Sequence, residues 1–218
     1  QAPWRPDRLE ELSYAPFRAM VAGNLRHSGG LRVDHIMGLF RLWWIPEGLP
    51  PTEGAYVRYN HEAMVGILLL EARRAGALVV GEDLGTVEPW VRDYLRDRGI
   101  LGTSVAWFEM QDGGVPLPPE AYREYCMASV TTHDMPPTAG YLALDHIRLQ
   151  HGLGMLTESL DEELALAERT FDTWNRELVQ RGFLAEGETD VAEKVLAMHR
   201  WIVASPARVL CAALTDAA

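Results

Sequence analysis

The stretch LVVGED at residues 78–83 decides the fold, because a short apolar run there stops at two acidic residues. The same layout occurs in LRVDH at residues 31–35 and in VTTHD at residues 130–134. Short buried runs that end in polar residues are typical of parallel barrel strands, whose carboxyl ends carry the functional side chains. The three stretches therefore predict a parallel α/β sheet with one carboxylate at the end of each strand.

Helical patterns separate these runs, and the alternation indicates βαβ units. Strands that are short and end in polar residues favour a barrel over an open sheet. We expect strands at residues 31–33, 77–80, 104–108, 127–131 and 208–214, and a long loop at residues 46–60. We expect a helix from Pro16 to Gly29-Gly30, with Phe17, Met20, Val21 and Leu25 on one face. A second helix should run from a cap at Asn60 to Gly76, and a third from a cap at Thr86 to Gly99. Three further helices are expected at residues 138–151, 162–181 and 191–204.

The composition excludes several classes of protein. A formal net charge of −11 argues against a nucleic-acid or anionic-membrane partner and fits a neutral sugar. No stretch approaches the roughly 18 apolar residues of a membrane span, and no signal-peptide pattern opens the chain. Cys126 and Cys211 have no metal-ligand spacing, so we expect buried free thiols, as in a reducing cytoplasm, with a disulfide as the minority alternative.

Two of the carboxylates suit the cleavage of a glycosidic bond with retention. That chemistry needs a carboxylate nucleophile and a carboxylic acid about 5–5.5 Å apart, which neighbouring strands can supply. Asp34 is the candidate nucleophile, and Arg32 lies two residues earlier on the same strand face, where its charge favours an ionised Asp34. Glu82 is the candidate acid and base, because its apolar setting and the like charge of Asp83 favour the protonated form.

The third carboxylate, Asp134, follows His133, and this pair can hydrogen-bond sugar hydroxyls. Structural alternatives remain for each stretch. A lone Asp after a strand is more often a helix cap, residues 82–85 can be an acidic turn, and His133 with Asp134 can be a structural pair. Because three strand ends carry carboxylates together with Arg32 and His133, cleavage of a glycosidic bond is favoured over these structural alternatives.

The chain resembles the amylomaltases, the 4-α-glucanotransferases of the α-amylase clan. The resemblance lies in six blocks that occur in the family's order: residues 14–20, 31–39, 40–48, 54–59, 80–85 and 131–136. It implies a (β/α)8 TIM barrel of the α-amylase type. Residues 1–218 are then a single partial catalytic domain, containing about strands four to eight with a helical insertion and truncated at both ends.

The resemblance also implies roles for the site residues. Asp34 is the nucleophile, Glu82 the general acid and base, and Asp134 the transition-state stabiliser, supported by Arg32 and His133. The reaction passes a piece of an α-1,4-glucan, such as a maltooligosaccharide, starch or glycogen, to the 4-hydroxyl of another glucan. No cofactor or metal is implied.

Transfer rather than hydrolysis requires that water be kept from the intermediate. The loop at residues 46–60 and the pair Trp43-Trp44 are candidates for this role, and the indoles can also stack on glucose. Plain packing is the alternative for both tryptophans. Further alternatives for the chain are an inactive or glucan-binding fragment, which can self-associate through open barrel edges, and a hydrolase or debranching relative.

Overall fold

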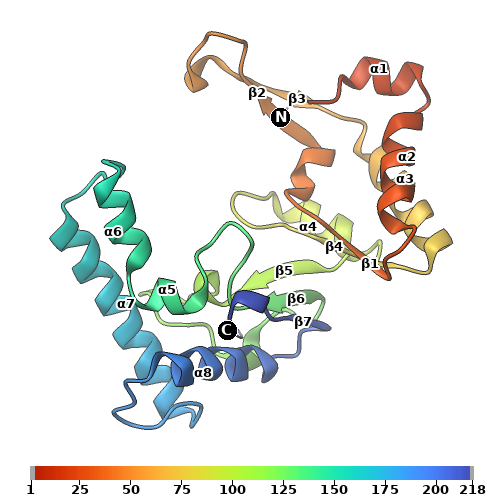
Figure 1. Cartoon of the computed structure of the whole chain (residues 1–218). Helices are drawn as coiled ribbons and strands as arrows, with labels where there is room; N and C mark the ends of the chain where they lie inside the picture. The colour runs from red at the N-terminus through yellow and green to blue at the C-terminus, as the bar shows by residue number, and fades with distance from the viewer. Residues whose placement is uncertain (1–2, 217–218) are drawn as a thin grey trace. The chain divides into compact units, whose positions relative to one another are not determined.

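The computed structural model describes residues 3–216, which divide into two compact units with the boundary between Thr103 and Ser104. Figure 1 traces the elements of each unit along the chain. The assignment of residues 1–218 to a single domain stays a prediction.

The first unit alternates helices and short strands. Strand β1 pairs in parallel with β4, and Leu101 forms a parallel bridge to Val80 on β4. Strands β2 and β3 form an antiparallel pair. The elements are α1 (Pro6–Glu11), α2 (Ala15–Leu25), β1 (Gly30–Val33), η1 (Ile36–Leu39), β2 (Arg41–Trp44), η2 (Pro51–Glu53), β3 (Ala55–Arg58), α3 (His61–Ala75), β4 (Leu78–Gly81) and α4 (Pro89–Arg96).

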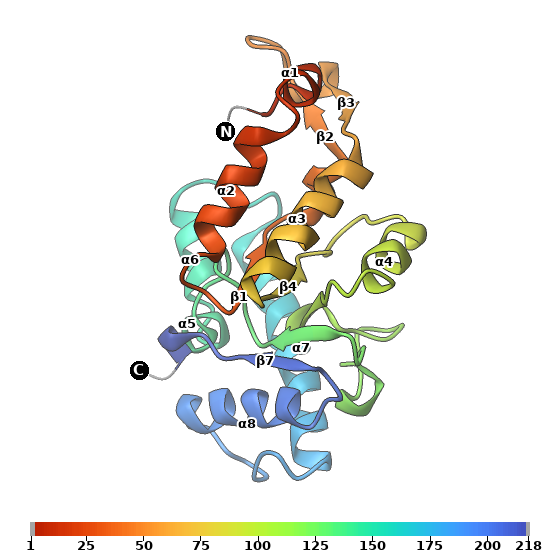
Figure 2. The same ribbon diagram turned by 90° about the vertical axis from the view of Figure 1, so that its right-hand side faces the viewer.

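Helices α2 and α3 lie side by side in both ribbon views (Figures 1 and 2). The expected ends of α3 are confirmed: the Asn60 side chain accepts the N–H of Ala63, and Gly76 follows the helix with φ 64°. The buried face of α2 consists of Phe17, Val21 and Leu25, as the spacing predicts. These side chains join a core of buried residues from α3, β4, α4 and the η1 turn.

The second unit contains a three-stranded sheet in the order β5-β6-β7, in which β6 and β7 are parallel. Helix α8 packs on β6, and α6 packs against α7 (Figure 1). The elements are β5 (Gly102–Val105), which crosses the boundary, η3 (Ala106–Phe108), η4 (Pro119–Ala121), β6 (Cys126–Ser129), α5 (Thr138–Leu142), α6 (Asp145–Gly152), α7 (Leu160–Gln180), α8 (Val191–Val203), β7 (Val209–Cys211) and η5 (Leu214–Asp216).

The core of the second unit is aromatic. Trp174 of α7 and Trp201 of α8 are buried, and their rings meet edge to face with centroids 5.3 Å apart. The acidic segment after residue 157 is therefore a helix with one buried face, and its charges lie mainly on the other side.

Three sequence expectations are wrong in detail. Thr86 does not cap α4, because Pro89 is the first helical residue and the preceding Glu88 is held extended at ψ 135°. The expected loop at residues 46–60 contains a strand, because residues 55–58 form β3, which pairs with β2; residues 46–54 are the loop between the two strands. The helix expected at residues 138–151 is two helices, separated at the buried Leu144 with φ 63°.

Smaller corrections concern exposure and element ends. Met20 is 45% exposed and does not join the core face of α2, which ends at Leu25, before the two glycines. The Cys126 thiol is buried, as expected, and donates to the carbonyl oxygen of Arg123, whereas the thiol of Cys211 is exposed. The third expected strand turns into the η3 turn after Val105.

Candidate active site

The ends of β1 and β4 bring two of the predicted carboxylates to one place. Val33 stands opposite Gly81 in the parallel register, so Asp34 and Glu82 are the next residues on neighbouring strands. Both follow the carboxyl end of their strand, where functional side chains gather in barrels of this kind. The expected placement on neighbouring strands is confirmed.

Backbone N–H groups fix the Glu82 carboxylate. Oε2 accepts the N–H of His35 at 2.8 Å, and Oε1 accepts the N–H of Leu84 at 2.6 Å. His35 has φ 45°, a left-handed conformation that is uncommon for a residue other than glycine. The N–H of Ile36 donates to the Glu82 carbonyl oxygen at 3.0 Å. The turn after Asp34 is thus bound to Glu82 through both side-chain and main-chain atoms.

Arg32 forms an ion pair with Asp34, with Nη1 2.8 Å from Oδ1. The side chains are on one face because they are two residues apart at the end of a strand, as predicted. The Asp34 side chain is 58% exposed and that of Arg32 is 27% exposed. The guanidinium therefore holds the carboxylate at the surface of the unit, where a substrate can reach it.

Asp83 has a different role from the one expected. Its side chain is buried and accepts the N–H of Thr103 at 2.9 Å. Arg92 of α4 approaches the other oxygen, with Nε 3.6 Å from Oδ2. Asp83 is therefore an ion-pair partner of Arg92 as well as the chain neighbour of Glu82. It ties the segment after β4 to the start of β5, a role that the sequence analysis missed.

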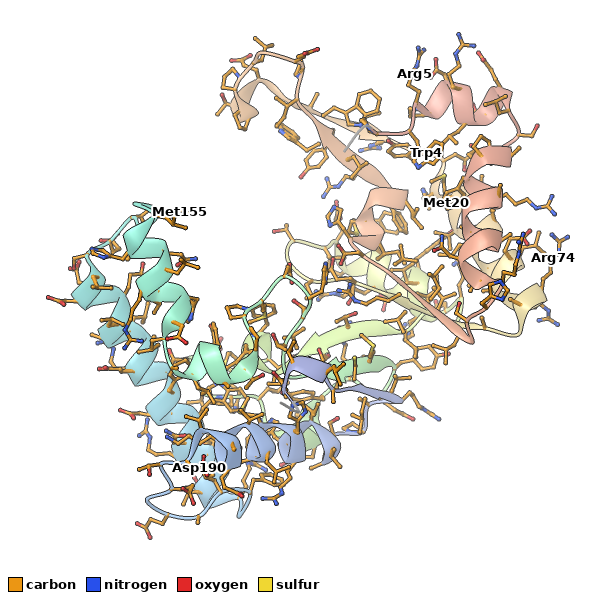
Figure 3. All side chains as sticks on the ribbon, in the orientation of Figure 1. Trp4, Arg5, Met20, Arg74, Met155 and Asp190 are labelled. Atoms are coloured by element: carbon orange, nitrogen blue, oxygen red, sulfur yellow. The ribbon has the colours of Figure 1, made fainter. Side chains whose placement is uncertain are left out.

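A cavity of about 740 Å³ opens beside Asp34 in the first unit. Its walls include His35, just before η1, and the two tryptophans of β2, Trp43 and Trp44. Trp4 and Met20, both labelled in Figure 3, also line it. The predicted tryptophans therefore share a cavity with the predicted nucleophile. No local sequence signal indicates that Trp4 lines this cavity. The Tyr59 hydroxyl, 55 residues away in the chain, donates to the Trp4 carbonyl oxygen at 2.8 Å.

Trp43 is fixed in orientation although it is 44% exposed. Its Nε1–H donates to the carbonyl oxygen of Pro51 at 3.0 Å. Its ring meets that of Tyr56 across the hairpin, edge to face, with centroids 4.9 Å apart. A half-exposed aromatic ring with a fixed orientation can bind an apolar face of a ligand.

The remaining predicted pair belongs to the second unit. His133 and Asp134 are exposed in a turn that follows β6, and the Thr132 hydroxyl donates to the Asp134 carboxylate. Their joining with Asp34 and Glu82 in one site stays a prediction. Within residues 3–216, no group of three or more His, Cys, Asp or Glu side chains is arranged to hold a metal ion. None of the helices in that range is long and apolar enough to cross a membrane.

Comparison with known proteins gives a consistent family. All 218 residues match the family model described as 4-alpha-glucanotransferase. A 4-alpha-glucanotransferase of Mycobacterium tuberculosis H37Rv is 60% identical over 222 residues, covering all of this chain and 31% of the relative. One from Haemophilus influenzae is 38% identical over 154 residues, covering 71% of this chain and 22% of the relative.

Solved structures agree with these relatives. The amylomaltase of Corynebacterium glutamicum superposes with a TM-score of 0.92 at 43% identity, covering 98% of this chain and 32% of that structure. The amylomaltase of Streptococcus agalactiae in complex with acarbose matches in fold, with a TM-score of 0.66 at 15% identity over 97% of this chain and 37% of that one. These matches confirm the predicted fold class, a partial α/β barrel of the α-amylase type. The chain spans about a third of the length of these relatives.

Proposed function

Because the chain belongs to the 4-alpha-glucanotransferase family, we propose that the protein transfers segments of α-1,4-glucans to the 4-hydroxyl of an acceptor glucan or glucose. Its substrates are maltooligosaccharides and starch- or glycogen-type glucans. The observation that supports this best is the pairing of Asp34 and Glu82 at the ends of β1 and β4, beside the cavity that Trp43 and Trp44 line.

In the first step of the proposed reaction, the Asp34 carboxylate attacks C1 of the donor glucose. The bond between C1 and the glycosidic oxygen breaks while Glu82 gives its proton to that oxygen. The leaving glucan departs with a free 4-hydroxyl, and the donor stays on Asp34 as a β-glucosyl ester. The N–H groups of His35 and Leu84 fix the position of the Glu82 carboxyl group next to the Asp34 turn.

In the second step, Glu82 takes the proton from the 4-hydroxyl of the acceptor, whose oxygen attacks C1. Asp34 leaves as a carboxylate, and two inversions restore the α configuration. Asp134 stabilises the oxocarbenium-like transition states with its negative charge, and Arg32 and His133 bind substrate hydroxyls. Trp43 and Trp44 bind the donor glucan and exclude water, which favours an acceptor sugar over hydrolysis. The proposed chemistry uses no cofactor.

The test is the product pattern from maltotriose with the purified 218-residue chain. We expect glucose together with a ladder of longer maltooligosaccharides. Asp34→Asn should lower the rate by about 10⁴-fold or more, the usual order for loss of a nucleophile. Asp112→Asn is the matched control, because Asp112 is an exposed carboxylate on a loop of the other unit. Glucose and maltose without a ladder would instead identify a hydrolase.

A second candidate is a glucan-binding chain without turnover. It is favoured by one fact, that the chain spans 31% of the curated relative's length. Binding of maltotriose without products, by a folded chain, would support it. We also propose that β1 and β7, which each stand at the edge of a sheet, allow self-association through their outer edges. The two cysteines are both thiols, which supports a cytoplasmic location.

A further inference from the structure

The loop that carries Asp134 runs from the end of β6 at Ser129 to the start of α5 at Thr138. Within the loop, the buried Thr131 hydroxyl donates to the carbonyl oxygen of Pro136 at 3.2 Å. This bond draws the two arms of the loop together. Asp134 itself is exposed in the turn between them. Its position therefore depends on how firmly both ends of the loop are held.

The exit of the loop is bound by a residue 78 positions away. The N–H of Thr138 donates to Oδ1 of Asp216 at 2.8 Å, and the Thr138 hydroxyl donates to Oδ2 at 2.7 Å. Thr138 is completely buried, and the Asp216 side chain is only 2% exposed. The N-cap of α5, Pro137, makes no side-chain cap bond, so Asp216 takes the place of a local cap.

His199 of α8 makes the third contact with the same carboxylate, with Nε2 3.2 Å from Oδ2 of Asp216. An ionised carboxylate only accepts hydrogen bonds, so the Nε2–H of His199 donates to it. The neighbouring α8 residues Ala197 and Met198 are buried, and α8 packs on β6. The exit of the loop is therefore anchored through His199 to the same helix that covers the strand at its entry.

We infer that Asp216 and His199 are positioning residues that hold Asp134 in place through Thr138. The inference rests on the proposed function for the role of Asp134. A buried carboxylate costs free energy unless it is well hydrogen-bonded, and here all of its contacts that we describe converge on the start of α5 and on α8. Such a group suits a fixed loop better than a mobile one.

The test compares Thr138→Val with Thr138→Ser. Valine keeps the shape of the buried side chain and removes the hydroxyl donor to Asp216, while the backbone N–H donor at position 138 remains; serine retains both donors. We expect amide hydrogen exchange in residues 131–137 to rise about tenfold or more in Thr138→Val, which is the usual effect of losing a hydrogen bond to a charged group. Thr138→Ser should remain close to the wild type. Thr173→Val is the matched control, because its hydroxyl donates to Arg169 within α7.

Transfer kinetics with maltotriose then separate positioning from general destabilisation. At a temperature well below unfolding, we expect Thr138→Val to lower kcat about tenfold with KM within about twofold. It should have no further effect when Asp134 is already asparagine. The inference is overturned if Thr138→Val exchanges in residues 131–137 no faster than Thr173→Val does. It is also overturned if Thr138→Val lowers kcat by the same factor when Asp134 is already asparagine. If the wild-type chain has no turnover, the proposed function fails and the exchange comparison alone decides the inference.

Discussion

Gly81 ends β4 opposite Val33, at a point where the structure leaves no room for a side chain. A Cβ at position 81 would lie 2.5 Å from Cδ1 and 3.1 Å from Cγ2 of Ile36. Ile36 is fully buried, and its N–H holds the carbonyl oxygen of Glu82. Gly81→Ala must therefore displace Ile36, or separate the strands where Asp34 and Glu82 follow.

Two effects set the size of the change. Overpacking a close-packed core costs about 1–3 kcal/mol. Alanine loses less chain entropy on folding than glycine, which returns about 0.5–1 kcal/mol. We expect a net loss of about 1–2 kcal/mol for Gly81→Ala. Ile36→Val removes the Cδ1 atom and costs about 0.5–1.5 kcal/mol by itself. In the double variant, most of the penalty at position 81 should disappear.

Urea unfolding at 25 °C, followed by tryptophan fluorescence, measures these free energies. The control is Gly66→Ala in the middle of α3, where no atom of another described element lies within 4 Å of an added Cβ. We expect this control to stabilise the protein by about 0.5–1 kcal/mol. The reasoning is refuted if Gly81→Ala costs less than about 0.5 kcal/mol, or if it costs the same with and without the Ile36 methyl.

Two further predictions concern the cavity and the surface charge. An added Cβ at Gly54 would overlap the indole of Trp43, so Gly54→Ala should turn the ring away and raise KM for maltotriose about fivefold, the equivalent of about 1 kcal/mol of aromatic contact. An unchanged KM, with altered Trp43 fluorescence, would mean that this ring does not touch the substrate. The second prediction concerns Glu71 on α3. Hydrogen bonds from Arg18 and Arg74 lower the pKa of Glu71 below its ordinary 4.5, although burial opposes this change. The stability that Glu71 contributes is thus fully present above pH 4.5 and is lost as the pH falls through the lower pKa of the folded state. Glu71→Gln should destabilise at pH 6, and its difference from the wild type should shrink as the pH falls below 4.5; an equal loss in urea unfolding at every pH would point to packing instead of charge.

Local patterns were enough to predict most of the helices and strands. The cap at Asn60 and the stop at Gly76 follow from side-chain and backbone preferences that act within one turn of helix. The spacing from Asp34 to Glu82 predicted neighbouring strands, since one crossover connects them. Expectations failed where two local preferences compete, as at Thr86 and Pro89, since the proline fixes the start of α4.

The sequence by itself determined that strands alternate with helices and that Asp34, Glu82 and Asp134 follow strands, because both depend on short-range periodicity and turn chemistry. Only the tertiary structure decided which distant groups hold Glu82 and the exit of the loop that carries Asp134. The N–H of His35 reaches Glu82 across 47 residues, and Asp216 reaches Thr138 across 78. Such contacts depend on strand register and helix packing over long sequence separations, and no residue near either partner in the chain indicates them.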